Sequence, residues 1–104
     1  MLTAKDRRRL RQIAHHLEPV VIVAGKGLSE GVVQEVNRAL TDHELIKVRV
    51  DIADRDLRRA AADELALRCA ADIAQSIGKV WVLYRPNPEA NAKLSNLKRR
   101  AGSG

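Results

Sequence analysis

The feature that most constrains the fold is an unbroken apolar run at residues 20–24, followed at once by the turn Gly25-Lys26-Gly27. Most residues of the run are β-branched, which favours a strand. Because both faces of such a strand are apolar, the run predicts a central strand that is covered on each side. Ser29 is then placed to cap a helix whose first turn contains Glu30. The segment therefore predicts a strand, a turn and a helix in close succession.

The other elements follow from capping residues and apolar periodicity. Thr3 and Asp6 resemble a capping box and predict a first helix that ends before Pro19. Residues 46–52 alternate between apolar and polar side chains, which predicts a strand with one core face and one wet, mostly basic face. A third helix is expected from 54 or 56 to 69, with three residues facing the core, and two strands are expected at 73–77 and 80–84. The three expected core residues of that helix are Leu57, Ala61 and Leu65.

The predicted fold class is α/β, in the order α-β-α-β-α-β-β, with a mixed four-stranded sheet. Two β-α-β crossovers and a hairpin would connect the strands. With only three helices, part of one face or edge of this sheet should stay exposed. Residues 1–88 are expected to form one domain, and the polar residues 89–104 are expected to form a basic flexible tail.

The charge predicts a polyanionic partner. Lys and Arg number 19 against 13 Asp and Glu, which gives a net charge of +6 and a pI near 10.1. Residues 1–17 have a net charge of +4 and residues 89–104 of +3, so the middle of the chain has −1. Such a surplus indicates binding to nucleic acid or to an anionic membrane, the alternative being a merely soluble basic protein.

The location expected from the sequence is the cytoplasm. The start of the chain has no apolar signal-peptide region, and no apolar run approaches the length that spans a membrane. Cys69 is the single cysteine and cannot form an internal disulfide, which fits a reducing compartment. Its alanine-rich surroundings predict a buried side chain with a packing role.

Three phosphate-binding motifs compete to explain the glycine turn. A Walker A loop is excluded because Lys26 is followed by Gly27 rather than Ser or Thr. A dinucleotide fingerprint is disfavoured because Gly25, Gly27 and Gly31 are spaced one residue too far, and Glu30 would oppose a pyrophosphate. The third is the G-x-x-G loop that holds nucleic-acid backbone in KH modules, although alanine stands at the first glycine position here.

Four segments together resemble a known family. They are the strand with the turn and helix start AGKGLSEG, the stretch DHELIKV at 42–48, the tripeptide IGK at 77–79 and the stretch VLYRP at 82–86. In this order and spacing they resemble the CRM (chloroplast RNA splicing and ribosome maturation) domain, and most of all its stand-alone bacterial YhbY type. The likeness covers residues 2–88.

This resemblance implies an RNA-binding domain with a fold like the C-terminal domain of bacterial translation initiation factor three. It also implies association with precursors of the large ribosomal subunit. The family loop is G-x-x-G, so Ala24 departs from it, and alanine does not tolerate a left-handed turn. Residues 25–27 match the family loop better than residue 24 does.

No convergent set of catalytic or metal-binding residues is found. His15 and His16 are adjacent and diverge by about 100° on a helix, so they cannot share one metal. His43 is better explained by the end of a helix than by acid–base work. Trp81 and Tyr84 are the only aromatic residues and are expected on opposite faces of one strand, with the tryptophan in the core.

The prediction is a non-enzymatic RNA-binding protein, monomeric and without a cofactor or metal, that binds ribosomal RNA and assists large-subunit assembly. The alternative is an Alba-like protein that binds duplex DNA or RNA, and a small enzyme is the third class. The residues expected to bind RNA are Gly25, Lys26, Gly27, Arg7, Arg8, Arg11, Lys47 and Arg49.

Overall fold

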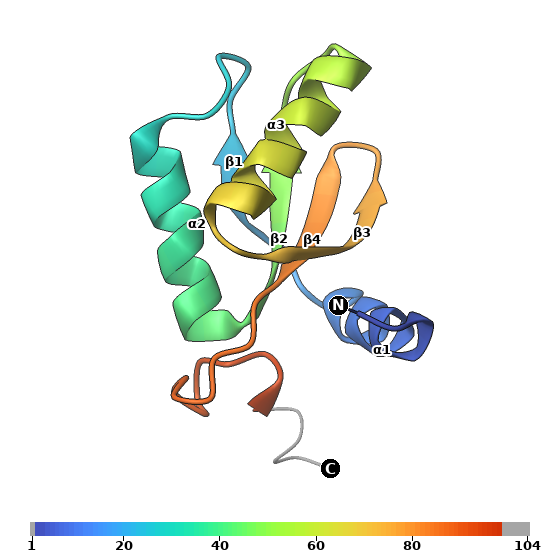
Figure 1. The fold of residues 1–104 in the computed structure, drawn as a ribbon, viewed down its shortest axis with the longest axis vertical. Helices are drawn as coiled ribbons and strands as arrows, with labels where there is room; N and C mark the ends of the chain where they lie inside the picture. Colours follow the sequence, from blue (N-terminus) through green and yellow to red (C-terminus); the bar gives the residue numbers. More distant parts are fainter. Residues whose placement is uncertain (1, 99–104) are drawn as a thin grey trace.

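The computed structural model describes residues 2–98, which form a four-stranded mixed sheet with three helices (Figure 1). The sheet has the strand order β1-β2-β4-β3, with β1 parallel to β2 and β4 antiparallel to both of its neighbours. The last strand in the sequence is therefore a central strand of the sheet. This architecture confirms the predicted element order and the mixed sheet. The elements are α1 (Ala4–Ala14), β1 (Pro19–Val23), α2 (Glu30–His43), β2 (Leu45–Val50), α3 (Arg55–Arg68), β3 (Asp72–Ile77) and β4 (Val80–Tyr84).

Each helix begins at a side chain that caps it. The Thr3 hydroxyl accepts a hydrogen bond from the Asp6 amide at 3.0 Å, and the Asp6 carboxylate accepts one from the Thr3 amide at 3.0 Å. Ser29 caps α2, and Asp54 caps α3. Such caps typically contribute about 1 kcal/mol each. The predicted capping box and the predicted cap of the second helix are both confirmed.

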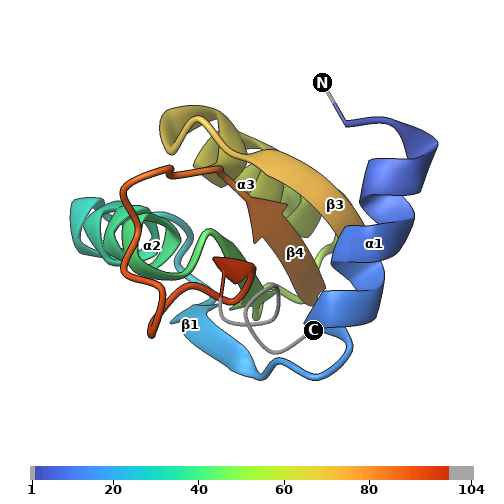
Figure 2. The ribbon, with the colours of Figure 1, turned by 90° about the horizontal axis from the view of Figure 1, so that it is seen from below.

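The sheet has helices on both faces (Figure 2). Helices α2 and α3 cover one face and form the main core with the inward residues of the strands, among them Val23, Leu40, Val48 and Leu65. Helix α1 packs on the opposite face and forms a smaller cluster. That cluster contains Leu10, Ala14, Leu45, Ala74 and Val82.

Strand β1 is an edge strand, so the prediction that it lies centrally, covered on both faces, was wrong. Val21 and Val23 are buried under α2, but Ile22 is 61% exposed and Val20 is 48% exposed. The physical reason is the position of α1, which packs against β2 and β3 and not over β1. Half of an apolar strand is thus left on the surface.

Helix α3 turns Leu65 to the core as predicted, but the prediction that Leu57 also faces the core was wrong. Leu57 is 62% exposed, whereas Ala62, Leu65 and Ala66 are buried. Ala61, which was expected to face inward, is partly buried against the core. An alanine-rich helix has apolar residues on several sides, so its sequence marks the core side weakly.

Residues 89–98, assigned by composition to a flexible tail, pack against the domain. Ser95 is fully buried and donates a hydrogen bond to the Glu44 carboxylate at 2.5 Å. The side-chain amide of Asn96 donates to the carbonyl of Leu45 at 2.6 Å. Buried polar side chains gain these bonds only in the folded chain, so composition alone does not reveal them. The domain boundary at residue 88 stays a prediction, and residues 99–104 of the expected tail lie outside the described residues.

Candidate nucleic-acid interface

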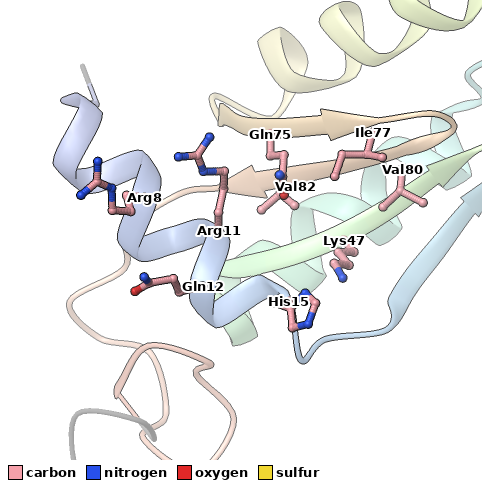
Figure 3. Close-up of a pocket in the computed structure, with 9 residues that line it drawn as sticks. All are labelled: Arg8, Arg11, Gln12, His15, Lys47, Gln75, Ile77, Val80 and Val82. Atoms are coloured by element: carbon pink, nitrogen blue, oxygen red, sulfur yellow. The ribbon is translucent and has the colours of Figure 1, made fainter.

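A groove of about 550 Å³ lies between α1 and the face of the sheet that α2 and α3 do not cover (Figure 3). We call it the open-face groove. Helix α1 supplies one wall with polar and basic side chains, and β2, β3 and β4 supply the floor. The residues that line it are Arg8, Arg11, Gln12, His15, Lys47, Gln75, Ile77, Val80 and Val82.

Strand pairing orders the floor in rows, because paired residues point to the same face of a sheet. Lys47 pairs with Val82, which pairs with Gln75. The next row begins at the exposed Ile22 of β1, which pairs with Arg49 of β2. That row continues through Val80 to Ile77, which is 66% exposed. Arg49 on β2 therefore lies in a row with the exposed Ile22 and Ile77 and the half-buried Val80, whereas the Val82 beside Lys47 is buried.

The charge of the open-face groove has one sign. Arg8, Arg11 and Lys47 line it, and within residues 2–98 no carboxylate does. In Figure 3 the guanidinium of Arg11 extends toward the sheet, and Lys47 rises from the floor near His15. A concave surface with several cations and no internal counter-charge attracts anions.

The Gly25–Gly27 turn lies at the other end of the sheet from α1 (Figure 1). The Gly27 amide donates to the Ala24 carbonyl at 3.0 Å, which closes the turn. Gly27 has a φ of +91°, whereas neither Ala24 nor Gly25 has a positive φ. Alanine therefore fits at position 24 without strain, and the backbone needs glycine at position 27. Lys26 is exposed at the tip.

Acidic and basic side chains meet next to this turn. Asp51 lies 3.2 Å from the ammonium of Lys79 and 3.9 Å from the guanidinium of Arg49. Its amide donates to the carbonyl of Val23 at 2.8 Å, which ties the end of β2 to the end of β1. The carboxylate thus partly neutralises Arg49 and leaves Lys26 without an acidic partner among the described residues.

The structure brings together only some of the residues predicted to bind RNA. Arg8, Arg11 and Lys47 share the open-face groove, and Arg49 occupies the next row of the same face. The glycine turn is separate from the groove. Arg7 faces the other way, where its guanidinium donates to the Ile73 carbonyl at 2.7 Å and lies in a different hollow.

Sequence reasoning missed the aliphatic floor. Ile77 and Val80 flank the tight turn between β3 and β4, and both were noted only as strand residues. Gln75, which lies between them and α1, was also missed. Two features of the sequence could have indicated this floor. Three helices leave part of the sheet exposed, and the residues of these strands alternate between its two faces.

The aromatic residues and the cysteine have structural roles. Trp81 is 6% exposed in the main core, and Tyr84 packs on the opposite face, as predicted. Cys69 is buried, and burial raises the pKa of its thiol. Within residues 2–98, no three His, Cys, Asp or Glu side chains are grouped in a way that would hold a metal ion. No helix in that range is long and apolar enough to cross a membrane.

Comparison with known proteins gives consistent matches over most of the chain. A sequence model of the CRS1 / YhbY (CRM) domain matches residues 2–85. A Pseudomonas aeruginosa protein named as a probable RNA-binding protein is 52% identical over 101 residues, which cover 97% of each chain. A Haemophilus influenzae protein named as an RNA-binding protein is 44% identical over 93 residues, or 89% of this chain and 94% of that one.

The fold is also found in a solved structure. The solution structure of a hypothetical protein from Staphylococcus aureus superimposes with a TM-score of 0.76 and is 32% identical. The match covers 88% of this chain and 95% of that chain. The likeness thus extends over most of both chains.

Proposed function

The chain belongs to the CRS1 / YhbY (CRM) domain family, and we propose that it is a non-enzymatic protein that binds RNA through the open face of its sheet. The observation that supports this proposal most is the open-face groove, where Arg8, Arg11 and Lys47 meet without any carboxylate. Two relatives that match most of the chain are named for RNA binding.

The groove would bind phosphate at its rim and an unpaired base on its floor. Guanidinium and ammonium groups donate charge-assisted hydrogen bonds to phosphate oxygens. The aliphatic side chains of Ile77 and Val80 offer an apolar surface to the face of a base, and the Gln75 amide offers both a donor and an acceptor. Since proteins recognise unpaired bases most directly, this arrangement favours a single-stranded segment or a loop.

The glycine turn would hold the RNA backbone at the other end of the same face. Lys26 is exposed there beside the backbone of Gly25 and Gly27, and it would contact a phosphate. Strand β2, with six residues between the two sites, is about 20 Å long. An extended RNA strand that follows β2 would therefore meet Lys47 and Arg49 on the way from α1 to the turn.

The specific target we propose is ribosomal RNA in precursors of the large subunit, where the protein would assist assembly in the cytoplasm as a monomer. The family resemblance supports this target. An Alba-like protein that binds duplex DNA or RNA is the alternative. An aliphatic floor suited to single bases favours the first function, since the bases of a duplex are stacked and covered.

RNA binding at this site is tested with the double variant Arg11→Glu/Lys47→Glu. Its control is Arg38→Glu/Lys93→Glu, which makes the same charge change at exposed residues outside the groove. We expect the first variant to lose at least about tenfold in affinity for single-stranded RNA, and the control to lose much less. Equal losses would mean that only net charge matters and would contradict the role of the groove.

The cellular target is tested by sucrose-gradient sedimentation of the tagged protein at low and moderate salt. We expect the wild type to travel with large-subunit precursors and Lys26→Glu to stay at the top of the gradient. Competition between ribosomal RNA and duplex DNA at fixed salt separates the two candidate functions. Preference for duplex DNA, or a wild type that stays at the top, would favour the Alba-like alternative.

A further inference from the structure

A second basic hollow lies on the other side of β3, between α1 and α3. It has a volume of about 670 Å³, and we call it the β3-edge groove. Four arginines line it, namely Arg7, Arg55, Arg58 and Arg59. We propose that this groove binds a second segment of the phosphate backbone of the RNA that the open-face groove holds. The proposal rests on RNA binding as proposed above and extends it to residues of α3.

The arginines converge from two helices. Arg55, Arg58 and Arg59 are spaced by three and four residues, so they share one side of α3. Arg58 donates to the Ile52 carbonyl at 3.0 Å, and Arg7 donates to the Ile73 carbonyl across the hollow. These bonds orient two guanidiniums and use one donor of five in each, so most donors remain available to a ligand.

This clustering of charge does not help the protein to fold. Like charges three or four residues apart on a helix destabilise it by about 0.2–0.5 kcal/mol per pair, and cations near the start of a helix oppose its dipole. Of the described residues that line the groove, Asp63 alone is a carboxylate. Among the described residues, none of the four guanidiniums lies within 4.0 Å of a carboxylate. Binding of an anion would explain why the cluster is present.

The two grooves lie on either side of β3. Arg7 and Arg8 are consecutive in α1 and diverge by about 100°, so one lines each groove. Gln75 and Ile77 of β3 face the open-face groove, whereas Ser76 faces the β3-edge groove. An RNA that bends around this edge strand would therefore place phosphates on both sides of it. A polyanion with regularly spaced charges fits such a wrapped surface better than a single small anion does.

The test measures how strongly a variant of the β3-edge groove and a control variant each bind a short and a long RNA. The variant is Arg55→Glu/Arg59→Glu, since both side chains are exposed and neither makes a hydrogen bond within the described residues. Arg38→Glu/Lys93→Glu is the control of equal charge. The probes are oligouridylates of about 6 and about 24 nucleotides, which span the range from one groove to both.

We expect the variant to bind the longer RNA about tenfold more weakly than the control does, with a slope of log affinity against log salt that is smaller by about 1.4. Affinity for the short RNA should equal that of the control. If the longer RNA binds the variant and the control equally, the proposal is overturned. Equal losses on both RNAs would also overturn it, because the groove would then not be a separate site.

Two further outcomes separate this proposal from its premise. If the wild type binds neither RNA, the proposed function is overturned, and with it the second RNA contact that rests on it. If RNA binding is unchanged by Arg55→Glu/Arg59→Glu but binding of polyglutamate is lost, the β3-edge groove recognises an acidic protein segment instead of RNA.

Discussion

Replacing Gly27 with alanine should destabilise the protein through backbone strain alone. Gly27 has a φ of +91°, and a β-carbon built there meets no atom within 4 Å. A left-handed conformation costs an L-residue about 1–2 kcal/mol. Alanine also restricts the unfolded chain, which offsets about 0.4–1 kcal/mol of that cost. We therefore expect Gly27→Ala to lower the free energy of unfolding by roughly 1 kcal/mol.

Gly25→Ala is the matched control, two residues away in the same turn. Gly25 has no positive φ, and its added β-carbon would lie 3.7 Å from the Asp51 carbonyl oxygen, an ordinary contact. The restricted unfolded chain should make this variant neutral or more stable, by up to about 1 kcal/mol. The difference between the two variants then isolates the strain, at about 1–2 kcal/mol.

Urea unfolding followed by Trp81 fluorescence measures both values, because this single tryptophan is buried in the core. The slope of the free energy with urea should be the same in both variants, which shows that unfolding exposes the same amount of surface. If Gly27→Ala is as stable as Gly25→Ala, the turn does not hold the left-handed conformation, and the reasoning fails.

Three further predictions concern other parts of the chain. Ser95→Ala removes the hydroxyl that donates to the buried Glu44 carboxylate, so it should lower the free energy of unfolding by about 1–3 kcal/mol. Urea unfolding measures this change. An unchanged free energy of unfolding would mean that residues 89–98 do not stay packed. Hydrogen bonds from Thr3 lower the pKa of Asp6, so the ionised carboxylate stabilises α1 above its ordinary pKa, and this stabilisation is lost as the pH falls through the lowered pKa. Helix content followed by circular dichroism should show this acid transition in the wild type. The Asp6→Asn variant should not show it. Burial raises the pKa of the Cys69 thiol, so iodoacetamide should label it far more slowly at neutral pH in the folded protein than in urea, and equal rates would contradict its burial.

Local signals in the sequence predicted the elements well. The capping box at Thr3, the cap at Ser29 and the alternation along β2 each depend on residues close in sequence, and each is present in the structure. The position of β1 at the edge depends instead on where α1 packs, which is a long-range property. An apolar run indicates a strand, but it does not show whether a helix covers both of its faces.

The candidate site was predictable in part for the same reason. Basic residues can be found in a sequence, but their partition between grooves requires the direction of each side chain. The 100° step between Arg7 and Arg8 already separates them on a helix. The spacing of Arg55, Arg58 and Arg59 is equally visible in the sequence, but the apolar pattern of that helix predicts only its core side. The aliphatic floor became apparent only when β4 was placed between β2 and β3.

The central position of β4 also matters for how the protein is made. Strands β2 and β3 are synthesised first, but they have no direct contact as sheet neighbours until residues 80–84 are inserted between them. A growing chain that ends before β4 lacks Trp81 and Leu83 of the main core and Val82 of the cluster under α1. The sheet can therefore close only after β4 has been synthesised, and until then the apolar faces of its earlier strands are incompletely covered.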